Sequence, residues 1–320
     1  MTKKDLPPID PMSRRLSLRH LRLIIAIAEE GNSVRAGNRI NLSQPAVTKS
    51  LQEAEKLLEA RLFERTTRGM MPTEYGAILI AHARIILSQI DRAFIELNNL
   101  KEGWVGQVNV GTLIAASANL LPHAISKLQD SHPKIRVKVY ANAHDILLPL
   151  LINGELDIIV GRLTQIRHHE NIIQEPLMEE IACVICAPDH PLAKLESVTL
   201  KDMARNKWIF PDKDTTLRRQ LDSAFRNEGL DSPEYSVESL SMLNNLELIL
   251  SAGYIGIVPW QTTRAKILHN RIKILPIQLK STYTPIGITR RADIEPSPAA
   301  AKFIAVLRAA AEVEPIQPLE

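Results

Sequence analysis

Polar side chains near residue 45 have the types and spacing needed to read a nucleic acid. From Ser43 to Leu51 the apolar residues recur every three or four positions, so a helix there would expose Gln44, Thr48 and Lys49 on its other face. Glutamine can pair with adenine, and lysine with guanine or phosphate, when a helix start enters the major groove. The alternative is a merely solvated helix face, and the surrounding elements decide between the two.

Two further helices are predicted before this one, in the arrangement of a helix-turn-helix. Ser17 can cap the first helix and Gly31 can end it, while Ser33 can cap a short second helix. Ser43 can cap the third helix. Pro45 falls in its first turn, where a missing N–H costs nothing, and so marks a start and not a break.

A pair of short extended segments follows the third helix. The segment Arg61 to Pro72 contains a Thr-Thr-Arg-Gly turn, with Arg65 and Arg68 beside it. Two strands around such a turn form a plausible wing, and arginines on a wing can grip phosphates. The context therefore favours a DNA-binding interpretation of the outward polar stripe.

The segment resembles the LysR-type family of transcription regulators. Ser43 to Thr48 match the Ser-Gln-Pro-Ala-Val-Ser/Thr start of that family's recognition helix, and Leu62 to Arg65 match its Leu-Phe-x-Arg wing. The resemblance is specific from Leu18 through the following long helix and looser beyond it. The residues expected at the DNA are Ser33, Arg35, Ser43, Gln44, Pro45, Thr48, Lys49, Arg65 and Arg68.

Two departures from the family pattern leave these contact residues in place. Gly37 follows Ala36 where the family usually has two alanines, and Tyr75 precedes Gly76 where alanine is commoner. Glycine costs a helix about 1 kcal/mol in propensity. We expect Gly37 to permit the close approach of another backbone segment.

A long helix from Thr73 to about Leu100 carries an apolar stripe with the spacing of a coiled coil. A core helix of a single globule is the alternative, but polar residues flank the stripe and favour a seam between two chains. Dimers place two recognition helices on two half-sites, and the resemblance implies homotetramers. The seam residues are Leu79, Ala83, Ile86, Ile90, Ala93, Leu97 and Leu100.

Composition places the chain among globular proteins that work inside the cell. Its 320 residues are 45% hydrophobic and 23% charged, and two cysteines cannot form a disulfide framework. Residues 1–100 hold 15 Lys and Arg against 11 Asp and Glu, a modest sign of a polyanionic partner. No apolar run reaches the roughly 20 residues of a membrane span, and residues 1–16 lack the apolar centre of an export signal. We therefore expect a cytoplasmic protein with a flexible basic tail.

Strands and helices alternate after a hinge at Lys101 to Gly106, which predicts parallel βαβ units. Crossings near Pro176 to Glu180 and Leu279 to Thr284 divide this part into two lobes. The architecture resembles periplasmic binding proteins and LysR-type effector domains. The expected strands are 107–113, 135–140, 156–160, 181–187, 255–259 and 284–289, and the expected helices are 119–131, 145–153, 216–227, 242–252 and 298–313.

The overall expectation is an α+β multidomain chain. It consists of a winged helix-turn-helix, a linker helix and a two-lobed α/β effector domain. The expected bounds are a tail at 1–16, the DNA-binding domain at 17–76, the dimerisation helix at 77–103, lobe I at about 104–178 and 284–313, lobe II at about 179–283, and a tail at 314–320.

Ligands of open α/β lobes bind where strands end and helices begin. The resemblance aligns Thr112 and His144 with pocket positions that commonly carry Thr or Ser, so His144 is a departure, and a surface histidine is the alternative. Sugars, sugar acids and aromatic acids remain open, since the opening region is most like regulators of sugar-uptake and aromatic-acid genes. The expected effector residues are Thr112, Ser117, His144, Arg162, Pro211, Asp212, Thr215, Ser239 and Ser241.

Rival functions find less support. Cys183, Cys186 and His190 have metal-like spacing, but they fall in and after an apolar strand, where residues three apart face opposite ways. Hydrolase, metalloprotease and phosphate-loop motifs are absent from the sequence, so we expect no catalytic residue, metal or cofactor. An exported solute-binding protein would leave residues 17–72 without a role. The expected partners are promoter DNA, a small effector, further copies of the chain and RNA polymerase, with no membrane.

Overall fold

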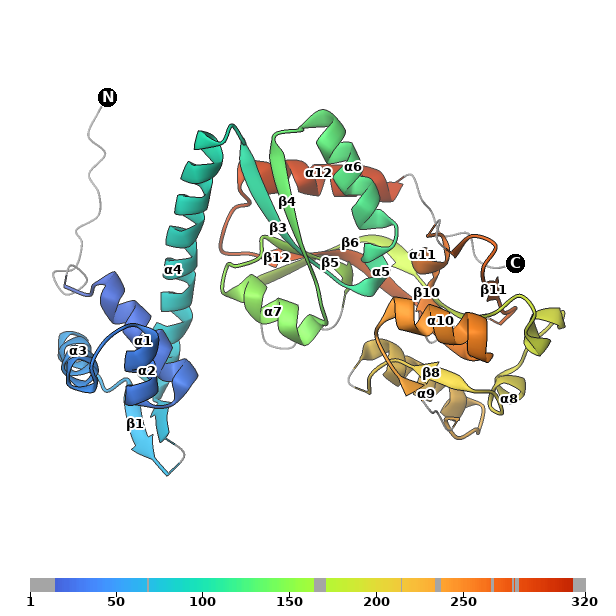
Figure 1. Ribbon diagram of the computed structural model, residues 1–320, viewed down its shortest axis with the longest axis horizontal. Helices are drawn as coiled ribbons and strands as arrows, with labels where there is room; N and C mark the ends of the chain where they lie inside the picture. Colours follow the sequence, from blue (N-terminus) through green and yellow to red (C-terminus); the bar gives the residue numbers. More distant parts are fainter. Residues whose placement is uncertain are drawn as a thin grey trace. The chain divides into compact units, whose positions relative to one another are not determined.

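The computed structural model describes residues 15–67, 69–163, 171–213, 215–233, 237–265, 268–277, 279 and 282–312 (Figure 1). It forms two compact units, one that ends at Asn98 and includes residues 152–155, and one that comprises Asn99–Leu151 and the chain from Leu156 onward. Each unit has its own hydrophobic core. Arg68 and the two expected tails, apart from Arg15 and Leu16, lie outside the described residues.

Three helices pack around the core of the first unit. They are α1 (Leu18–Glu30), α2 (Ser33–Arg39) and α3 (Gln44–Leu57). The apolar spacing predicted α1 and α3, and a serine suited to a cap predicted α2. The inward side chains are buried together, among them Leu23, Ile24, Val47 and Leu51. Gly37 lies where a Cβ would stand 2.5 Å from the Leu42 carbonyl oxygen, which confirms the close backbone approach expected there.

The helix caps follow the sequence in α1 and depart from it in α2 and α3. Ser17 accepts the N–H of His20, and Gly31, at φ 61°, ends α1 in the left-handed conformation. The expected cap of α2 at Ser33 is wrong, because the Asn32 side chain accepts the N–H groups of Val34 and Arg35. Ser43 occupies the cap position of α3, but its side chain makes no capping hydrogen bond.

A wing and a long helix complete this unit. The wing is the antiparallel pair β1 (Phe63–Thr66) and β2 (Gly69–Pro72), as the sequence predicted. The long helix is α4 (Glu74–Lys101), and the Thr73 hydroxyl caps it by accepting the N–H of Gly76 at 3.1 Å.

The start of the apolar stripe on α4 packs against the core of the first unit. Ala83 is buried, and Leu79 is half-buried against the same core as α1 and α3. From Ile86 onward the large apolar side chains of the stripe are half-buried or exposed. The part of the stripe that could meet a second chain therefore runs from Ile86 to Leu100.

The second unit contains one five-stranded sheet in each lobe. The strands of lobe I are β3 (Gly106–Thr112), β4 (Ile135–Ala141), β5 (Ile158–Arg162), β6 (Ile172–Glu180) and β12 (Thr284–Arg291), in the order β4-β3-β5-β12-β6. The strands of lobe II are β7 (Ala182–Cys186), β8 (Trp208–Phe210), β9 (Val237–Glu238), β10 (Ile255–Pro259) and β11 (Lys273–Ile274), in the order β11-β7-β10-β8-β9.

The expected parallel βαβ units are confirmed, but each sheet also contains antiparallel pairs and is therefore mixed. β3 lies parallel to β4 and β5, and β8 lies parallel to β9 and β10. β12 runs antiparallel to β5 and β6, while β7 runs antiparallel to β10 and β11. The antiparallel pairs arise where the chain crosses between the lobes. β6 leads directly into β7 of the other lobe, with no helix between them that would return the chain to the same sheet.

Helices cover both faces of each sheet. In lobe I, α6 (Leu120–Ser131) and α12 (Pro298–Glu312) pack side by side on one face, and α7 (His144–Ile152) covers the other (Figure 1). In lobe II, α9 (Thr216–Asn227) and α10 (Met242–Ala252) belong to separate apolar clusters. The short helices are α5 (Ile114–Ser117), η1 (Pro191–Lys194), α8 (Leu200–Met203) and α11 (Trp260–Thr263).

A buried carboxyl group lies at the first crossing between the lobes. Glu180 ends β6 and is fully buried, and its Oε1 accepts the N–H of Ile181 at 3.1 Å. The backbone N–H groups of Trp260 and Gln261 lie close to the same carboxyl, and the Trp260 N–H donates to the Ile181 carbonyl at 2.8 Å. Burial raises the pKa of Glu180 to about 7, although Arg162 and these N–H groups act in the opposite direction.

Glu180→Gln should remove a pH-dependent loss of stability. A carboxyl with a raised folded-state pKa holds its proton more tightly in the folded chain, so the free energy of unfolding falls as the pH rises from 4.5 to about 7. Across this range the wild type should lose on the order of 1 to 3 kcal/mol relative to the variant, because one pKa unit corresponds to about 1.4 kcal/mol.

Urea unfolding followed by tryptophan fluorescence measures this effect in the second unit, because Trp104, Trp208 and Trp260 all lie there. The comparison needs both proteins at several pH values from below 4.5 to above 7. A stability difference between them that stays constant over this range would contradict the prediction.

Candidate functional site: a DNA interface and an effector cleft

The start of α3 presents the polar residues that the sequence singled out. Gln44, Pro45 and Lys49 are exposed and Thr48 is half-buried, while Val47 on the other face is buried in the core. The apolar face therefore fixes the rotation of α3 about its axis. Polar side chains at the exposed amino end of a helix can reach base edges in a major groove.

The wing is held against the end of α1. The N–H of Met70 donates to the Gly31 carbonyl at 2.8 Å. Gly69 has φ 112°, and a Cβ there would stand 2.4 Å from the same carbonyl oxygen, so only glycine fits. Arg65 lies exposed on β1 of the wing that this contact holds in place.

A carboxylate that the sequence did not single out ties the wing to α3. Glu55 Oε1 accepts the N–H of Leu62 at 2.8 Å and that of Phe63 at 3.4 Å. An acidic residue on a helix is usually a solvated group, and the partners of Glu55 lie beyond the end of α3, at Leu62 and Phe63. No local signal in the sequence distinguishes Glu55 from its acidic neighbours.

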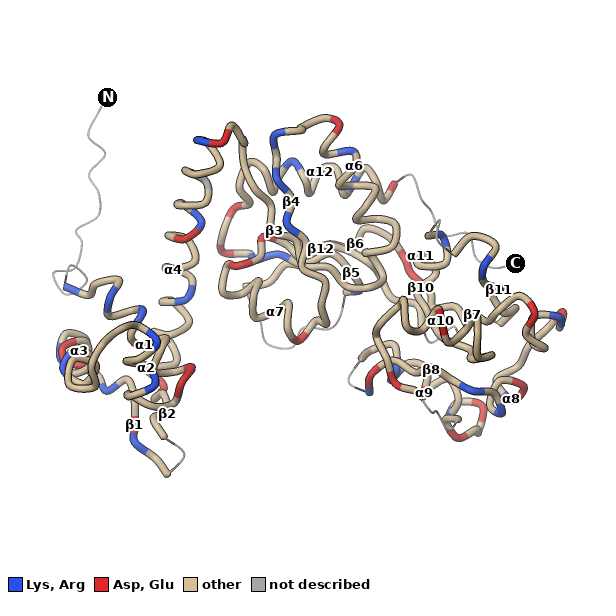
Figure 2. Tube along the Cα trace, viewed as in Figure 1, with Lys and Arg blue, Asp and Glu red and all other residues tan. Residues whose placement is uncertain are grey.

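The arginines of α2 are engaged with acids of their own unit. Arg35 donates to the Glu30 carbonyl, and its Nε lies 3.9 Å from a carboxylate oxygen of Glu30. Arg39 pairs with Glu29 at 2.6 Å. Figure 2 shows Lys and Arg also on α1 and β1. The charge of Arg35 is thus partly compensated before any DNA arrives, and Ser33 is half-buried.

In lobe I the expected effector residues lie at strand and helix ends, but their polar atoms are largely used within the lobe. Thr112 is buried, and its hydroxyl donates to the carbonyls of Leu113 and Val160 at 3.2 and 3.3 Å. The Ser117 hydroxyl donates to the Ile114 carbonyl at 3.0 Å. His144 begins α7, and burial lowers the pKa of its imidazole, while Asp145 opposes this effect.

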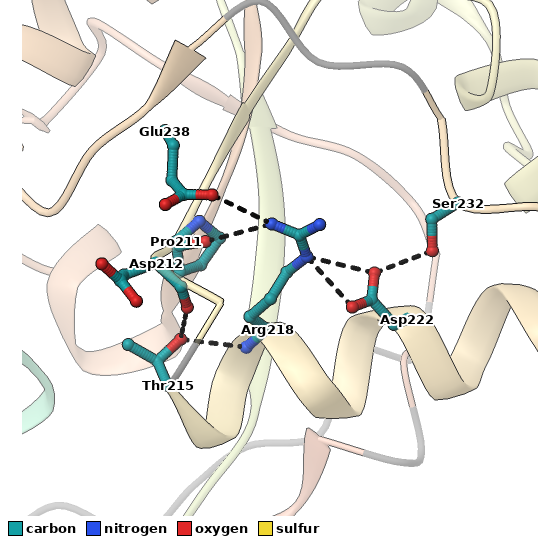
Figure 3. Close-up of polar contacts among 7 residues, drawn as sticks. All are labelled: Pro211, Asp212, Thr215, Arg218, Asp222, Ser232 and Glu238. Carbon is teal, nitrogen blue, oxygen red and sulfur yellow. Dashed lines mark hydrogen bonds and ion pairs between the residues drawn. The ribbon is translucent and has the colours of Figure 1, made fainter.

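In lobe II the loop between β8 and α9 is internally hydrogen-bonded (Figure 3). Pro211 is buried and Asp212 is exposed. The Thr215 hydroxyl donates to the Asp212 carbonyl at 2.7 Å and accepts the N–H of Arg218 at 3.2 Å, which caps α9. The neighbouring loop after β9 joins it, since the N–H of Ser239 donates to the Phe210 carbonyl at 2.9 Å. Ser241 caps α10.

The side chain of Arg218 holds this loop in place. The sequence analysis did not identify Arg218 as a residue of the site. Its side chain is 8% exposed, and Nε donates to both carboxylate oxygens of Asp222, at 3.0 and 3.1 Å (Figure 3). Nη1 lies 3.6 Å from Glu238 and donates to the Pro211 carbonyl at 3.4 Å. The guanidinium also lies over the Phe210 ring. One cation therefore joins β8, α9 and β9.

A pocket of about 300 Å³ opens between the lobes. Only Ser117 of the expected effector residues lines it. The buried Thr262 is a polar lining residue that sequence reasoning missed. The remaining lining is apolar and comes from α5, α10 and the chain after α11: Ile114, Ala118, Met242, Leu243, Leu246, Ala265 and Leu268.

Arg162 connects lobe I to lobe II. It ends β5 and is 9% exposed, and its Nη1 donates to the side-chain oxygen of Gln220 on α9 at 3.2 Å. Gln220 in turn donates to the Thr284 hydroxyl at 2.9 Å. Burial lowers the pKa of the guanidinium, while Glu180 and Cys183 oppose this effect. Among the expected effector residues, Arg162 is the one whose side chain reaches the opposite lobe in these contacts.

The cysteine and histidine pattern has a structural explanation. Cys183 and Cys186 are both buried on β7, and burial raises the pKa of their thiols to about 12 and about 11. His190 accepts the N–H of Leu192 and caps η1. Across the described ranges no three His, Cys, Asp or Glu residues are grouped as metal ligands. None of the described helices has the length and apolar character of a membrane span.

Comparisons with known proteins agree with both units. The GbpR regulator of Azospirillum brasilense, named an HTH-type transcriptional regulator, is 32% identical over 100% of this chain and 94% of its own length. CbnR complexed with its target DNA has a TM-score of 0.62 at 22% identity, covering 92% of this chain and all of that chain. The effector-binding domain of QuiR, solved with shikimate, has a TM-score of 0.55 at 22% identity over 66% of this chain and 99% of its own. These two structures share the fold.

Two family models span most of the sequence. Residues 18–77 match the bacterial regulatory helix-turn-helix protein of the lysR family, and residues 101–312 match the LysR substrate binding domain. The first match covers α1 to α3 and the wing, and the second covers both lobes. The chain belongs to the LysR family of DNA-binding transcription regulators.

Proposed function

We propose that α3 and the wing read a promoter half-site, and that a small metabolite between the lobes switches the regulator. The observation that supports DNA readout is the exposed amino end of α3, with Gln44 and Lys49 outward and Val47 in the core. Ser43, Pro45 and Thr48 belong to the same surface. Arg65, Arg68 and the second-helix residues Ser33 and Arg35 contact the phosphate backbone. The activity is regulation and not catalysis.

The dimer forms through α4. Exposed apolar side chains on α4 support this dimer, because a soluble single chain rarely leaves a continuous apolar surface in contact with water. They include Ile86, Leu97 and Leu100 of the expected stripe, together with Phe94 and Ile95, which the heptad pattern did not include. Pairs of dimers form the homotetramer, which acts on promoter DNA in the cytoplasm and contacts RNA polymerase.

The effector domain spans residues 104–313, with a linker helix before it and the DNA-binding domain at 17–76. The effector contacts the ends of β3, β5, β8 and β9. Two observations support this site: the loop that Arg218 holds in place, and the side chain of Arg162 that reaches α9. The pocket between the lobes adjoins it only through Ser117. The ligand classes proposed are sugars, sugar acids and aromatic acids.

Gln44→Ala should change sequence preference on DNA, because a glutamine paired to adenine contributes about 1 to 3 kcal/mol of discrimination. A gel-shift series over single-base variants of the operator measures it. Gln52→Ala is the matched control, since Gln52 is exposed on the same helix but lies away from its amino end. Equal preference for wild type and for a folded variant with alanine at 44, 48 and 49 would show that α3 is not the reading helix.

Ile86→Asp with Ile90→Asp should split the dimer, because paired like charges would be desolvated inside the seam. Light scattering should then report half the mass or less of the wild type. The control carries two aspartates off the stripe, at the exposed His82 and Asn98. A double seam variant that keeps the native mass would refute the seam.

A true effector should raise the Tm of the second unit and also shift the DNA footprint, since ligand and DNA affinities are linked. In a screen of sugars, sugar acids and aromatic acids, Asp212→Ala should weaken the active compound about tenfold, which corresponds to one lost hydrogen bond to a charged group. Asp231→Ala is the control, because Asp231 is exposed in the same lobe. Unchanged affinity in the Asp212 variant would place the site elsewhere.

A further inference from the structure

Two buried arginines of the second unit differ in how their charge is compensated. Arg218 lies between the carboxylates of Asp222 and Glu238. Arg162 is 9% exposed, yet its hydrogen bond among the described residues goes to the neutral amide of Gln220. A cation removed from water without an anion in contact costs several kcal/mol. The burial of Arg162 is therefore not explained by the contacts of this arrangement.

The unpaired atoms of Arg162 form one edge of its guanidinium. Nε and Nη2 are buried and have no hydrogen-bond partner within the described part of the chain. Arg308 uses the same edge to hold a carboxylate, since its Nε and Nη2 donate to the two oxygens of Glu175 at 2.6 and 2.8 Å. Two parallel N–H groups match the two oxygens of a carboxylate.

The nearby Glu180 does not fill this role. It attracts Arg162 electrostatically, but Nε and Nη2 of Arg162 and Oε2 of Glu180 have no hydrogen-bond partner within the described residues. The Oε1 atom of Glu180 instead accepts the backbone N–H of Ile181 at 3.1 Å. Ile181 lies between β6 and β7, so this bond holds the Glu180 carboxyl at the crossing of the chain between the lobes.

We propose that the Nε–Nη2 edge of Arg162 binds the carboxylate of an acidic effector. This rests on the proposed function, in which the cleft takes a small metabolite, and it narrows the ligand classes to acids. Sugar acids and aromatic acids share the carboxylate and differ in the body of the molecule.

Binding at this edge is coupled to the arrangement of the lobes. Gln220 belongs to α9 of lobe II, and it contacts both Arg162 and Thr284 of lobe I. Because Nε and Nη2 are inaccessible in this arrangement, a carboxylate reaches them only when α9 and β5 move apart. The ligand therefore favours one lobe arrangement over another, which is the requirement for a switch.

Thermal unfolding of the full chain, followed by tryptophan fluorescence, tests the inference. The probes are sodium acetate, benzoate and gluconate, against the neutral acetamide, benzamide and glucose, with ionic strength matched by sodium chloride. We expect at least one acid, but not its neutral counterpart, to raise the Tm at up to about 100 mM. A larger effect of benzoate than of gluconate, or the reverse, identifies the class of acid.

Variants connect this response to Arg162. Arg162→Lys keeps the charge but loses the planar pair of donors, so the apparent Kd for the acid should rise about 10-fold to 100-fold. Arg219→Lys, at the exposed residue before Gln220, should leave the Kd unchanged. Arg162→Gln removes the cation beside Glu180, and that loss alone can prevent folding. The double variant Arg162→Gln with Glu180→Gln removes both charges and replaces the single variant in the binding test if the single variant does not fold.

The outcomes separate this inference from the proposed function. An acid that binds the Arg162→Lys and double variants as tightly as the wild type overturns the inference, and so does the lack of any response to acids. A neutral sugar that raises the Tm and shifts the DNA footprint also overturns it, but leaves the proposed switch intact. Acid binding that depends on Arg162 without any change in the footprint supports the site and refutes its role as the switch.

Discussion

β6 carries the chain out of lobe I and β12 brings it back, and the two strands pair antiparallel from Thr284 beside Glu180 to Arg291 beside Ile172. Both crossings between the lobes therefore leave from neighbouring strands at one edge of the lobe I sheet. Any change in lobe arrangement must be absorbed in the few residues that follow this ladder. The buried Glu180 ends the edge strand β6, and Arg162, which contacts α9, ends the central strand β5 that pairs with β12.

Buried charge in the second unit follows the same geometry. Arg218 is surrounded by acids from α9 and β9, and it fixes a loop within one lobe. Arg162 and Glu180 lie where the two lobes meet, and each keeps a polar atom without a partner among the described residues. A fully satisfied network rigidifies a fold, whereas a partly satisfied one leaves free energy for a ligand to gain.

The DNA-binding unit relies on backbone contacts to position its side chains. Gly31 and Met70 join α1 to the wing, and Glu55 joins α3 to the residues that begin β1. Arg65 and the polar start of α3 are thereby held on one small framework. Rigid placement of this kind reduces the conformational entropy that binding would otherwise cost.

The sequence alone determined the elements whose signals are local. The alternation of strands and helices predicted α9 and α10 with the bounds that the structure shows, and the structure finds caps at Thr215, Ser241 and Gly253. The strand β10 was predicted with the bounds that the structure shows, because a short apolar run that follows a glycine is typical of a buried strand. The expected DNA-contact residues of α3 were inferred from one helix face, which is also a local property.

Only the tertiary structure decided the features that depend on distant partners. β6 contains Pro176 and several acids, which argue against a strand, but it lies at a sheet edge where proline is tolerated. The direction of β12 depends on its entry from the other lobe. From the sequence, Arg218 on an amphipathic helix is expected to be a solvated cation. Arg162 is expected only to mark the end of a strand. Which of these charges is buried, and against what, is set by segments far away in the sequence, and no local pattern encodes them.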